Sequence, residues 1–83
     1  MATTTTTPAS RVVADEVLAR LGRMRQSRVW LSAATGIPLT TLTRRLNAQS
    51  AFTIDELDII AHALGTGLVD LIASSAPPGA QAA

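Results

Sequence analysis

The stretch SRVWLSAATGIPLTTLTRRLN, residues 27–47, decides the fold of this chain. It has the pattern of two short helices joined by one tight turn. Ser27 is of a type that caps the N-terminus of a helix, and Gly36 is placed to end that helix, because glycine adopts the left-handed conformation at little cost. Pro38 then fixes the start of the next helix, which we expect over residues 39–47.

Each helix of the pair is expected to bury one face. In the first helix, Leu31 and Ala34 should face inward, and Ile37 should fill the core from the turn. In the second helix, Leu42 and Leu46 lie one turn apart on the buried side. The residues expected on its outer side are Thr40, Thr43, Arg44 and Asn47. This face, which carries hydroxyl groups and an arginine, is the candidate functional surface.

An earlier helix is predicted over residues 11–24, with Ser10 as its cap. Apolar side chains recur in it at helical spacing, at Val13, Val17, Leu18, Leu21 and Met24. Gly22 lies inside this pattern at a cost of about 1 kcal/mol relative to alanine. Residues 1–9, with five threonines in a row, have little to bury and are predicted to form a flexible tail.

A capped helix after the central pair is the clearest local signal. Thr53 is placed to cap it, and Glu56 to complete a capping box. Phe52 and Leu57 are placed to form a hydrophobic staple. Its expected core stripe consists of Ile54, Leu57, Ile60, Ala61 and Leu64. Gly65 should end this helix.

A short last helix is predicted from Leu68 to about Ser74, with Leu68, Leu71 and Ile72 as its apolar positions. A Pro-Pro-Gly sequence follows, so residues 76–83 are predicted to form a second flexible tail. The length of 83 residues allows one domain, expected over residues 10–75. With one Trp, one Phe and no Tyr, the core must be built from aliphatic side chains, which favours an all-α domain over a sheet.

The net charge of +1 hides a strong asymmetry along the chain. Seven arginines and two carboxylates lie before Leu46, giving +5, whereas four carboxylates and no base follow it, giving −4. A domain that presents one face to a polyanion has such a distribution, although a surface kept soluble by mixed charges has it too.

Catalytic and metal-binding patterns are missing from the sequence. It has no cysteine, a lone His62, no paired nucleophile and base, and no glycine-rich phosphate loop. We therefore expect no enzyme activity, no cofactor, no metal and no small-molecule substrate. No apolar run approaches the roughly 20 residues that span a bilayer, and the start lacks the apolar centre of a secretory signal. A soluble, cytoplasmic protein without a membrane partner is expected.

Four segments together carry a resemblance to a known family: residues 31–42, 44–46, 52–57 and 60–65. They combine the turn glycine, the flanking apolar spacing and the capped helix, and they resemble the lambda-repressor-like (Cro/repressor, XRE-type) helix-turn-helix family. The resemblance covers about residues 10–74. It implies a compact all-α bundle of five helices, in which the second crosses the DNA backbone and the third enters the major groove.

The resemblance also implies the residues that would contact DNA. Those placed to read bases are Leu39, Thr40, Thr43 and Arg44. Those placed to bind phosphates are Ser27, Arg28, Thr41, Arg45 and Asn47. Arg44 is the best candidate for a bidentate contact with guanine, although it could also be a solvated charge on an ordinary helix face. The sequence departs from the family pattern at Arg28, where Gln is common, at Ser32, and at Pro38-Leu39, which replace a polar helix start.

The expected function is that of a small transcriptional regulator, of the phage Cro or repressor type, that binds a double-stranded DNA operator in a bacterial or phage-infected cell. Such domains usually bind two half-sites as dimers. The candidate residues for self-association are Leu68, Val69, Leu71 and Ile72, and a monomer that dimerises only on DNA is an alternative. From another class, a helical protein-protein interaction module, such as an antitoxin or antirepressor, is the competing hypothesis.

Overall fold

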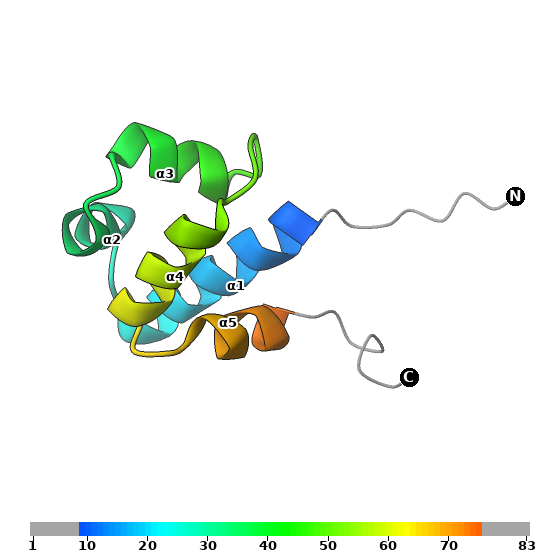
Figure 1. Cartoon of the computed structure of the whole chain (residues 1–83). Coiled ribbons are helices and arrows are strands. Elements are labelled where there is room, and N and C mark those ends of the chain that lie inside the picture. The colour runs from blue at the N-terminus through cyan, green and yellow to red at the C-terminus, as the bar shows by residue number, and fades with distance from the viewer. Residues whose placement is uncertain (1–8, 76–83) are drawn as a thin grey trace, which may run out of the picture.

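The computed structural model describes residues 9–75, which form five helices and no strand (Figure 1). The helices are α1 (Ala9–Met24), α2 (Arg28–Thr35), α3 (Leu39–Leu46), α4 (Ile54–Ala63) and α5 (Leu68–Ser75). The predicted all-α class is confirmed. The tails predicted at residues 1–8 and 76–83 lie outside the described residues, whereas Ala9 is already helical.

The helices surround one aliphatic core. α1 packs against α3 on one side and α5 on the other, α2 packs against α3 and α4, and α4 packs against α5 (Figure 1). The buried cluster consists of Val17, Leu21, Leu31, Ile37, Leu42, Leu46, Leu57, Ile60, Ala61, Leu64 and Leu71. The aromatic residues Trp30 and Phe52 only border it. A core of this composition is the one that the sequence predicts.

The predicted caps at both ends of α2 and at the start of α4 are confirmed. The Ser27 hydroxyl accepts a hydrogen bond from the Trp30 amide (3.0 Å), and Gly36 ends α2 in the left-handed conformation with φ of 79°. Thr53 and Glu56 form the complete capping box of α4. Gly65 follows α4 with φ of 78°. These local signals fix where each short helix starts or stops.

Ser10 is not the cap of α1. The helix begins at Ala9, so Ser10 already lies inside its first turn. Gly22 lies inside this helix, which continues to Met24. The chain instead leaves α1 at Arg25, which has a left-handed φ of 56°. Met24, predicted to face the core, is 40% exposed because it lies at this exit.

Three further core predictions are wrong. Ala34 is exposed, because the short helix α2 reaches the core mainly through Leu31. Ile54 is the first residue of α4 and is 64% exposed, while Phe52, just before the helix, packs against the core at this end. Ile72 is 41% exposed, so Leu71 is the fully buried residue of α5.

Among the described helices, none is both long enough and apolar enough to cross a membrane on its own. Only α4 and α5 taken together pass that test of length and composition, and the chain bends by 98° between them.

Candidate functional site

The predicted outer face of α3 is exposed at the edge of the molecule (Figure 1). Leu42 and Leu46 are fully buried and attach the helix to the core. Leu39, at 40%, and also Thr40, Arg44 and Asn47 are exposed, whereas Thr41 and Thr43 are half-buried. Thr40 and Arg44 lie one turn apart, as do Leu39 and Thr43, so these four side chains form one continuous strip along α3.

The N-terminal end of α3 has no side-chain cap. Pro38 occupies the cap position with φ of −56°, and it has no side-chain group that can accept a hydrogen bond. The first helical bond runs from the Leu42 amide to the Pro38 carbonyl (2.9 Å). The amides of the first turn therefore face outward beside Leu39 and Thr40, and they give this end a partial positive charge.

Three arginines carry free positive charge near α2 and α3. Within residues 9–75, the side chains of Arg25, Arg28 and Arg44 make no hydrogen bond or ion pair. Arg25 lies between α1 and α2, Arg28 begins α2, and Arg44 belongs to α3. The segment from residue 17 to residue 54 contains six arginines and no carboxylate. The region around α2 and α3 is therefore the basic part of the molecule.

Other arginines are used inside the fold. Arg20 pairs with Glu16 (2.9 Å) and donates to the Ser74 hydroxyl (3.0 Å), which ties α1 to α5. Arg23 lies 3.6 Å from the same Glu16 carboxylate. Arg11 donates to the backbone carbonyl of Asn47 (3.2 Å) and thus joins the start of α1 to the end of α3.

Arg45, predicted as a phosphate ligand, pairs with a carboxylate of the protein itself. Its Nε lies 2.9 Å from Oε1 of Glu56, its Nη2 lies 3.3 Å from Oε2, and its Nη1 donates to the Ser50 hydroxyl. The paired side chain is only 21% exposed. The hydrogen bond between the two side chains raises the pKa of Arg45. The same bond lowers the pKa of Glu56, and the bond from the Thr53 amide lowers it further, whereas burial opposes this shift. The loop between α3 and α4 brings the first turn of α4, which carries Glu56, next to Arg45.

The remaining predicted contacts are distributed as follows. The Ser27 hydroxyl is occupied by the cap of α2, whereas Arg28 beside it is free. The Asn47 carbonyl accepts the Arg11 bond, and this residue is exposed at the end of α3. The structure thus brings the predicted base-reading residues onto one strip and places Arg28 at the start of the adjoining helix.

The predicted self-association residues of α5 divide into two groups. Leu71 is fully buried and Leu68 packs against the core, so Leu71 is withdrawn as a contact residue. Val69, at 77%, and Ile72, at 41%, are exposed. Of the four predicted residues, these two are therefore accessible to a second protomer.

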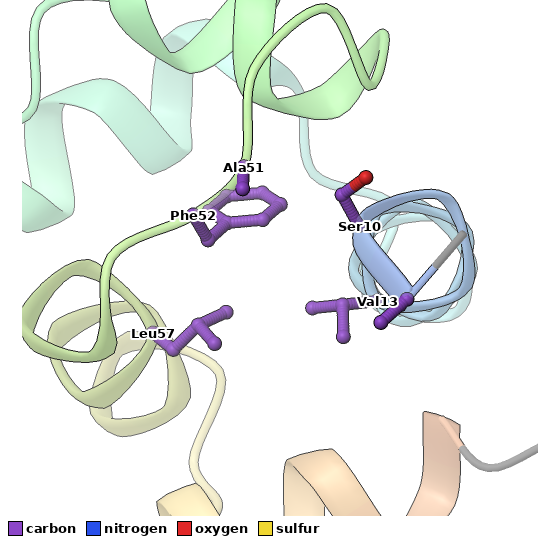
Figure 2. A pocket seen from close by; sticks show the side chains of 6 residues that line it. Ser10, Val13, Ala51, Phe52 and Leu57 are labelled. Atoms are coloured by element: carbon purple, nitrogen blue, oxygen red, sulfur yellow. The ribbon is translucent and has the colours of Figure 1, made fainter.

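A hollow of about 160 Å³ lies between the start of α1 and the segment that leads into α4. It is lined by Ala9, Ser10, Val13, Ala51, Phe52 and Leu57. Figure 2 shows Phe52 and Leu57 on one side and Ser10 and Val13 on the other. The lining is apolar apart from the Ser10 hydroxyl and contains no titratable group, so it offers no chemistry that competes with the α3 strip.

The comparisons with known proteins give no match: no family model fits the chain, and no curated protein or solved structure is significantly similar to it.

Proposed function

We propose that the protein binds double-stranded DNA sequence-specifically as a small transcriptional regulator of the lambda-repressor-like helix-turn-helix type. In this proposal α3 lies in the major groove and α2 crosses the sugar-phosphate backbone. The observation that carries it is the exposed strip of α3, where the unpaired Arg44 stands one turn from Thr40 and no carboxylate lies nearby in the sequence. Support also comes from the tight turn at Gly36, which ends α2 in the left-handed conformation three residues before α3 begins.

Each part of this surface has a chemical role in the proposal. The Arg44 guanidinium donates to the O6 and N7 atoms of a guanine, a contact worth about 1–3 kcal/mol of discrimination. Leu39 and the methyl group of Thr40 suit contact with a thymine methyl. Arg28 and the amides at the start of α2 bind phosphates, which position the protein without distinguishing sequences. Asn47 and Thr41 flank the strip and are assigned to the backbone as well.

The proposal includes a pair of protomers on the operator. One eight-residue helix reads few base pairs, and Val69 and Ile72 of α5 offer an exposed apolar contact between copies. Duplexes selected from a random pool should therefore contain two half-sites about 10 base pairs apart, centre to centre. A single half-site in the selected DNA would show that the protein binds as a monomer.

Gel-shift titrations with selected and random duplexes at several salt concentrations test the proposal. Each phosphate neutralised by a free arginine contributes about 0.9 to the slope of log K against log salt, so Arg25 and Arg28 predict a slope of about −2 per protomer. Arg28→Ala should weaken both duplexes alike, whereas Arg44→Ala should mainly remove the preference for the selected duplex. Arg20→Gln, on the α5 side, is the control and should leave the slope unchanged.

Absence of binding to any duplex at low salt would reject this function. The protein-protein interaction module, such as an antitoxin or antirepressor, would then become the better explanation, with exposed Val69 and Ile72 as its first candidate contacts.

A further inference from the structure

The pair formed by Arg45 and Glu56 lies beside the proposed DNA-reading strip without being part of it. We propose that Glu56 is a positioning residue: by holding Arg45 it fixes the rotation of α3 about its own axis, and with it the direction of Arg44. This inference rests on the proposed function and deepens it, because it identifies a residue that sets sequence discrimination without contacting DNA.

The geometry of the pair restrains the whole guanidinium group. Nε and Nη2 face the two carboxylate oxygens of Glu56 at 2.9 and 3.3 Å, and Nη1 is bound to the Ser50 hydroxyl. All three nitrogens are therefore engaged, and the plane of the fork is fixed. With exposed fractions of 21% for Arg45 and 18% for Glu56, both side chains are largely shielded from competing water.

Glu56 is itself anchored to a rigid element. Its Oε1 atom accepts a hydrogen bond from the Thr53 amide (2.9 Å), and its own amide donates to the Thr53 hydroxyl (3.0 Å). α4 enters the core through Leu57, the next residue, and through Ile60, one turn further along. The carboxylate that holds Arg45 is thus fixed by the capping box before any DNA is bound, which makes it a preorganised support.

α3 packs against α1 and α2, and Arg45 adds a link to α4. α3 has eight residues and no side-chain cap at its start, and its two fully buried side chains, Leu42 and Leu46, lie along a single line. The Arg11 bond to the Asn47 carbonyl holds only the C-terminal end of this helix. Arg45 gives an attachment off the line of Leu42 and Leu46, about 100° around the helix axis from Arg44.

DNA-binding measurements on Arg45→Gln and Glu56→Gln test the inference against the alternative that Arg45 binds a phosphate. Arg45→Gln should bind the selected duplex about tenfold more weakly, while its affinity for random duplex and its salt slope stay unchanged. Glu56→Gln should lose the same preference for the selected duplex. Arg45→Lys, which keeps one charged bond to Glu56, should recover part of the discrimination. The matched control is Arg28→Gln, for which both duplexes should weaken and the slope should fall by about 0.9.

The outcomes separate this inference from the proposed function. If wild-type protein prefers the selected duplex but Arg45→Gln loses affinity and slope as Arg28→Gln does, Arg45 is a phosphate ligand and the inference is wrong. Unchanged discrimination in both variants also overturns it. Thermal unfolding monitored by circular dichroism checks that each variant is folded. If Arg45→Gln is unstable, Glu56→Gln is the second variant, because its amide oxygen can still accept the hydrogen bond from the Thr53 amide. If wild-type protein binds no duplex, the proposed function fails, and the inference fails with it.

Discussion

Single residues in the left-handed conformation close four of the helices, and only two of these residues, Gly36 and Gly65, are glycine. Arg25 after α1 and Ala48 after α3 have φ of 56° and 59°, against 78° for Gly65 after α4. At Ala48 the Gln49 amide donates to the Arg44 carbonyl (2.9 Å), and at Gly65 the Thr66 amide donates to the Ala61 carbonyl (2.9 Å). The two ends have the same hydrogen-bond pattern, so the difference between them is the Cβ of Ala48.

Ala48→Gly should therefore stabilise the protein. Removing the Cβ relieves a conformational cost of about 1 kcal/mol or more, part of which is offset by the greater freedom of glycine in the unfolded chain, so a gain of about 0.5–1 kcal/mol is expected. Gly65→Ala should lower the free energy of unfolding by about 1 kcal/mol for the opposite reason. Urea denaturation of both variants measures this. A loss of stability in Ala48→Gly would contradict the described geometry at the end of α3.

At the scale of elements, the link between α3 and α4 should appear in the pH dependence of stability. The Arg45 and Thr53 donors lower the pKa of Glu56 in the folded protein below its unfolded value of about 4.3. The ionised carboxylate thus adds stability above that unfolded value, and this contribution is lost as pH falls through the lower folded pKa. Urea denaturation between neutral pH and about pH 3 should show a smaller decline for Arg45→Gln than for wild type. Equal declines would mean that the pair does not couple the two helices.

The elements also show which features can be predicted from sequence. Ser27, Gly36, Thr53 and Gly65 act on backbone groups a few residues away, so their signals are local and the helix boundaries they predict are confirmed. The pairing of Arg45 with Glu56 joins two helices across a loop, so the helical periodicity of the sequence does not predict it. This pairing engages Arg45, one of the predicted phosphate ligands, inside the protein. The exposure of Ile54 likewise depends on how the start of α4 meets the core, which spacing alone does not define.

At the scale of the whole molecule, the unpaired arginines and the carboxylates lie in different parts of the described fold. Four arginines form ion pairs with carboxylates of the protein: Arg11, Arg20, Arg23 and Arg45. The free ones are at or next to α2 and α3, while the carboxylates of α4 and α5 include Asp55, Asp58 and Asp70. In the proposed function, this distribution attracts a polyanion toward the α2–α3 side, which favours one orientation on DNA.

Amide chemical shifts followed by NMR during titration with a selected duplex would locate the DNA-binding surface. If α3 enters the major groove, the shifts should concentrate at residues 27–30 and 39–47, while α5 changes little except where a second protomer contacts Val69 and Ile72. Largest shifts along α5 or α4, with α3 unaffected, would contradict the assignment of the α2–α3 surface as the DNA-binding site.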